Sequence, residues 1–274
     1  FSHIPSIGVA TEKRIWDSGV CSIDEFIKSP PGFLSGAKLN KINRHILLSR
    51  DSIRNRDAGY FYESLPSKEH WRLFREYQDS AAYIDIETTG LGGPDDIITT
   101  IALYDGKAIR HYVNGVNLDD FVEDIRTYKI IITYNGKTFD VPFIERFFGI
   151  SLPHPHLDLR YILSSLGYSG GLKSCEIQLG IRRPDGLAGV EGFFAVLLWR
   201  DYVSRKNRKS LDTLLSYNIE DVLNLECLMI EAYNRKAGEL PFAAELLTIP
   251  PRPENPFRVC EATVSRIRDR FYWV

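Results

Sequence analysis

The sequence predicts an α/β domain that follows a helical N-terminal segment. From residue 81 to residue 235, apolar runs of strand length come first, and strands then alternate with longer runs of helical spacing, a pattern typical of α/β domains. Residues 1–80 have a helical pattern. The chain has 274 residues, 44% hydrophobic and 26% charged. It is long enough for one large domain, or for a domain of ordinary size with an accessory piece.

The N-terminal segment is expected to form short helices and one longer helix. Ser22, with Glu25 three residues later, has the form of a capping box at a helix start. A Pro-Pro-Gly break at residues 30–32 precedes the longer helix. The predicted helices cover residues 11–17, 22–27, 37–56 and 68–78.

A sheet is expected to begin at Ala81, where the helical pattern gives way to apolar runs of strand length. Asp105 and Gly106 form a hairpin signal between the second and third predicted strands. In order, the sequence predicts strands over 81–86, 97–103 and 108–113, a helix over 118–127, a strand over 130–133, a turn at 135–136, a helix over 141–148, a short strand ending at 158, and mostly helix until Pro241. The predicted domains are a helical segment over 1–80, an α/β domain over 81–235 and a Pro-rich C-terminal extension over 236–274.

Charge and cysteine content exclude several classes of protein. Lys plus Arg number 34 and Asp plus Glu number 36, which gives a net charge of −2 and excludes a uniformly basic nucleic-acid coat. The four cysteines are far apart and form no Cys-x-x-Cys pair. This argues against a zinc site or a disulfide framework and favours a reducing, cytoplasmic location. No run approaches the roughly 18 apolar residues of a membrane span, so no membrane partner is expected.

Two acids share one face of the first predicted strand. Asp85 and Glu87 are two residues apart, so both side chains point to one side while Ile84 and Ile86 point to the other. Two buried carboxylates are costly without a cation. The alternative is an exposed strand edge.

Three further acids are candidates for a functional site. Asp140 lies at a predicted helix start, where a simple N-cap is the alternative. Asp221 follows Tyr217 by four residues on one predicted helical face, and an ordinary surface pair is the alternative. Asp158 ends a short apolar strand and is left outside the predicted catalytic set. The order of the other acids within one α/β domain favours a shared site.

Three segments resemble the motifs of the DEDD 3′–5′ exonucleases of the ribonuclease H-like superfamily. Residues 83–91 (Tyr-Ile-Asp-Ile-Glu-Thr-Thr-Gly-Leu) resemble the first motif, and residues 134–140 (Tyr-Asn-Gly-Lys-Thr-Phe-Asp) resemble the second. Residues 217–221 (Tyr-Asn-Ile-Glu-Asp) resemble the third motif in its tyrosine form. The histidine form has a His five residues before the Asp, where this chain has Ser216.

The amino-acid sequences of these segments are most similar to those of the YprB-like group of predicted exonucleases. That group also shows the Leu-Asp-Leu found at residues 157–159 and the Leu-Lys-Ser found at 172–174. The resemblance implies a ribonuclease H-like mixed sheet flanked by helices. It also implies phosphodiester hydrolysis with two divalent ions, Mg²⁺ or Mn²⁺, which prefer oxygen ligands.

The resemblance implies a role for each site residue. Asp85 would bridge both ions, Glu87 and Asp221 would complete the site that activates water, and Asp140 would hold the second ion. Tyr217, with an ordinary pKa of ~10, would orient the attacking water.

The substrate implied by the resemblance is nucleic acid, DNA or RNA, with single-stranded ends. The backbone from Thr88 to Leu91 would grip the terminal nucleotide, with the Leu91 side chain against its base. Asn135 could contact the same nucleotide.

The N-terminal segment resembles a helix-hairpin-helix unit. Its hairpin would be residues 4–8, with Ser6 where the motif has its first glycine. A purely structural helical pair is the alternative. Residues 28–56 hold seven basic residues and one acid, and residues 199–210 hold a second basic run. Both runs are candidate phosphate-tracking surfaces, with solvated faces as the alternative.

The sequence therefore predicts a metal-dependent 3′–5′ exonuclease. A structure-dependent endonuclease with the same metal site is one alternative. A nucleic-acid-binding module without catalysis is the other, and the retention of four acids and a tyrosine at the motif positions argues against it.

Overall fold

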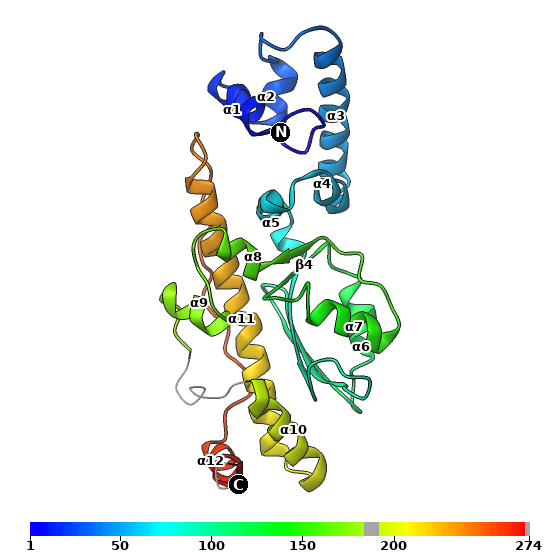
Figure 1. Ribbon diagram of the computed structural model, residues 1–274, viewed down its shortest axis with the longest axis vertical. Helices are drawn as coiled ribbons and strands as arrows, with labels where there is room; N and C mark the ends of the chain where they lie inside the picture. The colour runs from blue at the N-terminus through cyan, green and yellow to red at the C-terminus, as the bar shows by residue number, and fades with distance from the viewer. Residues whose placement is uncertain (184–191, 272–274) are drawn as a thin grey trace. The chain divides into compact units, whose positions relative to one another are not determined.

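The protein forms two compact units (Figure 1). We call them the helical unit and the sheet unit. The computed structural model describes residues 1–183 and 192–271. The helical unit contains residues 1–78 and 230–248, and the sheet unit contains residues 79–229 and those from 249 onward.

The helical unit begins with the helices that the sequence predicts. The Ser22–Glu25 capping box is confirmed, because each of the two side chains accepts a hydrogen bond from the other residue's backbone N–H. Asp57 caps a short helix that was not predicted, through a hydrogen bond from the Tyr60 N–H to its Oδ1 (3.2 Å). The elements are α1 (Val9–Asp17), α2 (Ile23–Lys28), α3 (Gly36–Arg54), α4 (Ala58–Ser64), the 3₁₀ helix η1 (Ser67–Arg72) and α5 (Leu73–Tyr77).

A small apolar core holds α1, α2 and α3 together. Ile15, Phe26, Ile42 and Ile46 are all almost fully buried in it. Leu47 of α3 lies outside this core and is 47% exposed.

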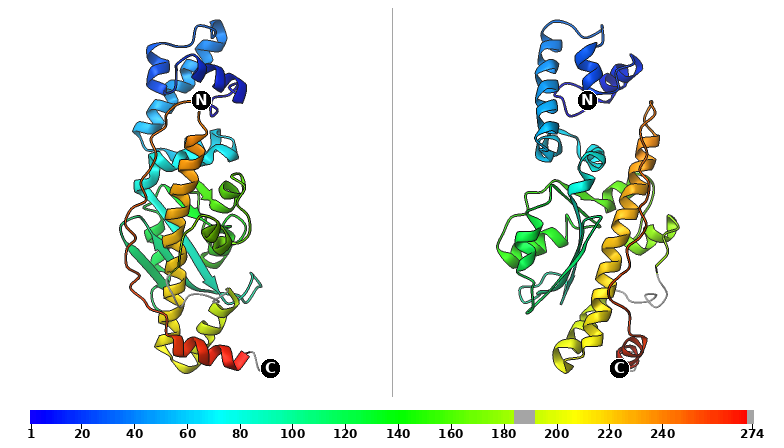
Figure 2. Two further views of the ribbon diagram at one scale, coloured as in Figure 1. Left: turned by 90° about the vertical axis from the view of Figure 1, so that its left-hand side faces the viewer. Right: turned by 180° about the vertical axis from the view of Figure 1, so that it is seen from behind.

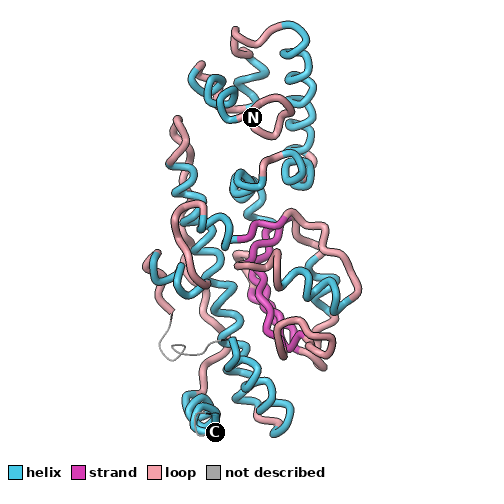
Figure 3. The backbone as a smooth tube through the Cα atoms, in the orientation of Figure 1, coloured by secondary structure: helices cyan, strands magenta, loops and turns pink. Residues whose placement is uncertain are grey.

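The sheet unit is built on a mixed sheet, drawn in magenta in Figure 3. Its five strands have the order β3-β2-β1-β4-β5. β1 pairs antiparallel with β2, and β2 with β3, whereas β1 pairs parallel with β4, and β4 with β5. The central strand β1, the site of the acid pair, is therefore flanked on both sides. The strands are β1 (Ala81–Thr88), β2 (Ile98–Tyr104), β3 (Ile109–Val113), β4 (Ile130–Thr133) and β5 (His156–Asp158), and a short 3₁₀ turn η2 (Gln78–Ser80) precedes them.

Helices cover both faces of this sheet (Figures 1 and 2). On one face, Ile84 and Ile86 of β1 join a buried cluster with α6 (Asp120–Ile125) and α7 (Asp140–Phe148). Residues 208–229 of the long helix α11 lie along the other face. The remaining helices are α8 (Leu159–Ser164), α9 (Leu172–Gln178), α10 (Gly192–Arg205), α11 (Arg208–Gly238) and α12 (Glu261–Phe271).

The C-terminal residues differ in part from the sequence prediction. Residues 249–259 are extended, as the prolines indicate, but α12 follows them and was not predicted. Val264 and Ile267 of α12 are buried in a cluster with α10 and α11, so tertiary packing supports this short helix. No helix among the described residues is long and apolar enough to cross a membrane.

Candidate active site

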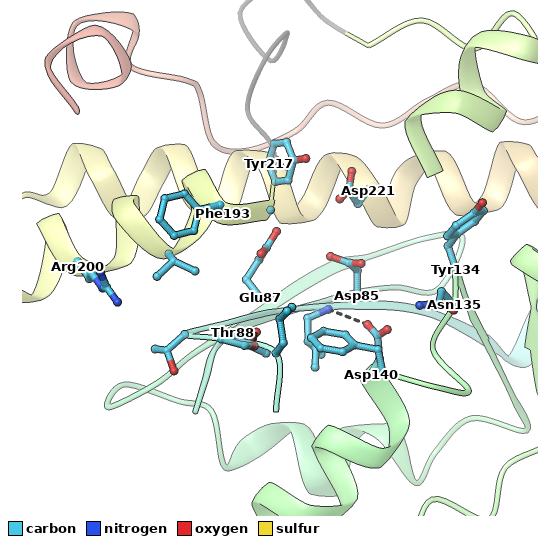
Figure 4. Close-up of a pocket in the computed structure, with 17 residues that line it drawn as sticks. Asp85, Glu87, Thr88, Tyr134, Asn135, Asp140, Phe193, Arg200, Tyr217 and Asp221 are labelled. Atoms are coloured by element: carbon cyan, nitrogen blue, oxygen red, sulfur yellow. Dashed lines mark hydrogen bonds between the residues drawn. The ribbon is translucent and has the colours of Figure 1, made fainter. Parts of the chain in front are cut away.

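A cavity of about 490 Å³ opens between β1, the loop after β4, α10 and α11 (Figure 4). All eight residues that the sequence assigned to the site line it, together with Phe193 and Arg200 of α10. The eight are Asp85, Glu87, Thr88, Leu91, Asn135, Asp140, Tyr217 and Asp221.

Three of the four predicted metal ligands meet in one cluster. Asp85, Glu87 and Asp221 each offer a carboxylate oxygen, and these oxygens lie within 4.8 Å of one another. The alternation of β1 explains the pair, because Ile84 and Ile86 fill the core on the opposite face. The exposed-edge alternative for the pair is wrong, since β1 is the central strand and Glu87 is 9% exposed.

Asp140 lies beside this cluster and does not belong to it. It is the first residue of α7, and its Oδ1 accepts a hydrogen bond from the Ile86 N–H at 3.2 Å. The N-cap position is occupied by Phe139, so the simple N-cap alternative for Asp140 is wrong. Its carboxylate faces the cavity from the side of β1 opposite α11 (Figure 4).

The crowding of acids shifts their proton affinities. Burial, followed by the charges of Asp221 and Asp140, raises the pKa of Asp85 and of Glu87 well above the ordinary range. Burial raises the pKa of Asp140 to about 7. Burial also raises the pKa of Asp221 to about 6, with Arg183 opposing the increase. Near neutral pH the cluster therefore favours bound protons or a bound cation.

The donor set fits a hard divalent cation. Carboxylate oxygens are the ligands that Mg²⁺ and Mn²⁺ prefer, and zinc more often takes nitrogen and sulfur. Among the described residues, the cluster of Asp85, Glu87 and Asp221 is the arrangement that could hold a metal ion, and it contains no His or Cys.

Asn218 fixes Asp85 and was missed by the sequence analysis. Its Nδ2 donates to Asp85 Oδ2 at 2.7 Å and to the Asp85 carbonyl at 3.1 Å, and its Oδ1 accepts from Thr100 Oγ1 at 3.0 Å. Asn218 is fully buried. The signal was present, because an amide three residues before Asp221 lies on the same helical face.

Tyr217 and Asp221 share one face of α11, one turn apart. Tyr217 is 4% exposed, so the surface-pair alternative is wrong. Burial and then the Asp221 charge raise the pKa of the Tyr217 hydroxyl, which argues against a role as a base. Its ring is flanked by Lys173 Nζ, 4.7 Å from the ring centroid, and by Arg183 Cζ at 5.7 Å.

The predicted substrate residues differ in their surroundings. Leu91 is 93% exposed at the rim of the cavity. The Thr88 hydroxyl donates to the Gly90 carbonyl at 2.6 Å, which shapes the turn after β1. Asn135 has φ +67°, and its Oδ1 accepts from Arg160 Nη1 at 2.5 Å.

Asp158 organises the loop that carries Asn135. Its carboxylate accepts hydrogen bonds from the backbone N–H groups of Asn135 (2.8 Å), Lys137 (3.0 Å) and Arg160 (3.0 Å). It is 2% exposed. Asp158 thus supports the site from outside the cavity.

A comparison with known protein families agrees with this architecture. A family model described as the RNase_H superfamily matches residues 82–233, more than half of the chain. The chain therefore belongs to the RNase H superfamily, and the predicted ribonuclease H-like fold is confirmed. None of the curated proteins compared with it matches.

Solved structures also resemble the chain. The family B DNA polymerase from the hyperthermophilic archaeon Pyrobaculum calidifontis is 16% identical, with 62% of this chain and 31% of that chain covered and a TM-score of 0.38. Brucella melitensis NrnC is 21% identical, with 60% and 77% covered and a TM-score of 0.38. Brucella melitensis NrnC with bound Mg²⁺ is 20% identical, with 62% and 93% covered and a TM-score of 0.31. The chain spans about a third of the length of the polymerase.

Proposed function

We propose that this protein is a metal-dependent nuclease that removes nucleotides from the 3′ end of single-stranded nucleic acid. The observation that carries the proposal is the convergence of Asp85, Glu87 and Asp221 oxygens within 4.8 Å. Bringing three carboxylates together is costly unless cations neutralise them. A cavity beside a cluster of this kind suits a phosphodiester, whose hydrolysis needs the same cations.

Each side chain has a role in this proposal. Asp85, Glu87 and Asp221 would hold divalent ions, Mg²⁺ or Mn²⁺, and Asp140 would complete a second ion site. Bound ions of this kind lower the pKa of a water molecule and neutralise the leaving oxygen. Tyr217, with a raised hydroxyl pKa, would hydrogen-bond to the attacking water and orient it. It would keep its own proton.

The cavity rim supports a substrate with unpaired bases. Leu91 and Phe193 line the same cavity, and they are 93% and 65% exposed to solvent, respectively. Apolar and aromatic groups at such positions stack against unpaired bases of any sequence. The tyrosine form of the third motif, with Tyr217 four residues before Asp221, supports the further proposal that the protein is a DEDD exonuclease of the tyrosine subclass.

Degradation of end-labelled oligonucleotides tests the proposal. A 5′-labelled single strand of DNA or RNA should give a ladder of successively shorter products with Mg²⁺ or Mn²⁺, and no products with EDTA. A 3′-phosphorothioate end should slow the first cut. Cleavage of a closed single-stranded circle would instead indicate an endonuclease. Binding without cleavage under any metal would indicate a non-catalytic module.

A further inference from the structure

Arg183 contacts the acid cluster from the side of α9. Its Nη2 lies 2.6 Å from Asp221 Oδ1, and the side chains of the two residues are 12% and 11% exposed. The contact is an ion pair by distance and lacks the alignment of a hydrogen bond. Arg183 lies 38 positions before Asp221 (221 − 183) and outside the three motifs found in the sequence.

Glu176 of α9 fixes the guanidinium. Arg183 Nε donates to Glu176 Oε2 at 2.6 Å and Nη2 donates to Oε1 at 2.7 Å, the two-point geometry that an arginine forms with a carboxylate. Glu176 is 1% exposed, and Asn224 Nδ2 on α11 also donates to its Oε1 at 2.8 Å. The arginine therefore has little freedom to leave its position.

The guanidinium reaches Asp221 from outside the cavity. Among the described residues, those that line the cavity include Asp221 and do not include Arg183. A carboxylate has two oxygens, so the pairing of Asp221 Oδ1 with Arg183 leaves Asp221 Oδ2 for a cation. The same guanidinium lies 5.7 Å from the Tyr217 ring centroid, so one group contacts both site residues on this face of α11.

We propose that Arg183, fixed by Glu176, is a positioning residue that orients Asp221 for binding a divalent cation and braces the Tyr217 ring. The proposal rests on the proposed function, because it assumes a metal at the acid cluster. The partners that orient metal ligands commonly set metal affinity, and losing one typically costs about 10–100-fold.

Calorimetric titration of the full chain with Mn²⁺ tests this role. Arg183→Gln should bind Mn²⁺ about 10–100-fold more weakly than the wild type. Arg183→Lys keeps the positive charge but has no planar fork to span Glu176 and Asp221, so it should also bind at least about tenfold more weakly. Wild-type affinity in either variant would overturn the proposal. Tighter binding by Arg183→Gln would also overturn it, because the guanidinium would then compete with the metal.

Arg266 of α12 offers a matched control. Its Nη1 donates to Asp201 Oδ1 at 2.9 Å and its Nη2 donates to Asp201 Oδ2 at 2.6 Å, and Asp201 of α10 is 8% exposed. Arg266→Gln removes a comparable two-point ion pair from the same unit, so it should lower the unfolding temperature and leave the Mn²⁺ affinity within about twofold. A similar loss of Mn²⁺ affinity in Arg266→Gln would assign the Arg183 effect to general destabilisation and overturn the proposal.

The wild type and Asp85→Asn separate this proposal from the proposed function. No Mn²⁺ binding by the wild type would contradict the metal site itself. Binding by the wild type that is lost in Asp85→Asn and unchanged in Arg183→Gln would contradict only the role of Arg183. If circular dichroism shows that Arg183→Gln does not fold, the Mn²⁺ affinity of Arg183→Lys tests the role of Arg183.

Discussion

Carboxylates as close as those of Asp85, Glu87 and Asp221 repel one another unless protons or cations intervene. The protein holds them together with neutral and cationic neighbours. Asn218 hydrogen-bonds Asp85, and Arg183 pairs with Asp221. These neighbours offset only part of the negative charge, because the pKa values of all three acids are raised. The cluster is thus prepared for a cation.

Ligand and orienting residue should respond differently to substitution. Asp85→Asn removes a charge from the cluster, so nuclease turnover should fall to background and added Mn²⁺ should not restore it. Tyr217→Phe keeps every carboxylate and removes one hydroxyl, so turnover should fall by about 10–1,000-fold with Mn²⁺ binding retained. Single-turnover cleavage and calorimetry measure the two effects. Full activity in Asp85→Asn would contradict the metal mechanism, and full activity in Tyr217→Phe would contradict only the role of the tyrosine.

Asp140 makes the stability of the metal-free protein depend on pH. Its pKa is raised from 3.8 in the unfolded chain to about 7 in the folded protein, so the folded state binds the proton more tightly. The stability that this proton provides is present below about pH 4 and is lost as pH rises through about 7. The Asp140→Asn variant has no titrating group at position 140. In EDTA, the unfolding temperature of the wild type minus that of Asp140→Asn should fall between pH 5 and pH 8. A difference that is constant or rises with pH would contradict the raised pKa.

At the scale of elements, one carboxylate joins the ends of two parallel strands. β4 and β5 are paired, with Thr133 opposite Asp158, and the loop after β4 leads through Asn135 to Asp140. Asp158 caps α8 by accepting from the Arg160 N–H and also accepts from the loop after β4. This loop is close-packed, because a side-chain Cβ at Gly136 would lie 2.3 Å from Thr133 Oγ1.

Asp158→Asn should loosen this loop. The amide keeps one acceptor oxygen, but its NH₂ group would face a backbone N–H that now has no acceptor. An unmade buried hydrogen bond costs about 1–3 kcal/mol, which denaturant unfolding measures. Asp95→Asn, at an exposed position, is the control and should change stability by less than about 0.5 kcal/mol. Equal effects of the two substitutions would show that the Asp158 hydrogen bonds contribute nothing specific.

At the scale of the whole molecule, the long helix α11 belongs to both units. Residues 208–229 carry Tyr217 and Asp221 in the sheet unit, and residues from 230 onward contribute to the helical unit. Within the helical unit, Tyr233 packs edge-on against Trp71, with ring centroids 5.7 Å apart. Deletion of residues 1–80 would therefore expose apolar surface on α11, so substitutions are the better test of the helical unit.

The basic residues of α3 are expected to bind nucleic-acid phosphates. Lys38, Lys41 and Arg44 are exposed, and replacing all three by Gln should weaken binding of a single-stranded oligonucleotide. The slope of log affinity against log salt should become shallower by about 0.7 for each lost phosphate contact. Fluorescence anisotropy over a range of salt concentrations measures both effects.

A second triple variant controls for net charge. Lys107, Arg126 and Arg258 are exposed in the sheet unit, and their replacement by Gln removes the same charge. An equal change of affinity and salt slope in both variants would show that α3 contributes only net charge.

Local patterns in the sequence determined much of the fold and most of the cavity lining. The alternation around Asp85 and Glu87 predicted a strand with two acids on one face, and the spacing of Tyr217 and Asp221 placed both on one helical face. Such patterns succeed because the period of a strand or helix is a property of a few neighbouring residues. The motifs in family order then indicated that distant segments share one site.

Only the tertiary structure decided which residues hold that site in place. Asn218 and Asp85 are 133 positions apart, and the Arg183–Asp221 pair depends on where the chain after α9 returns to α11. The association of residues 230–248 with the N-terminal helices is equally invisible in local patterns. These contacts form because buried polar groups need partners, and the path of the folded chain determines which partners come within reach.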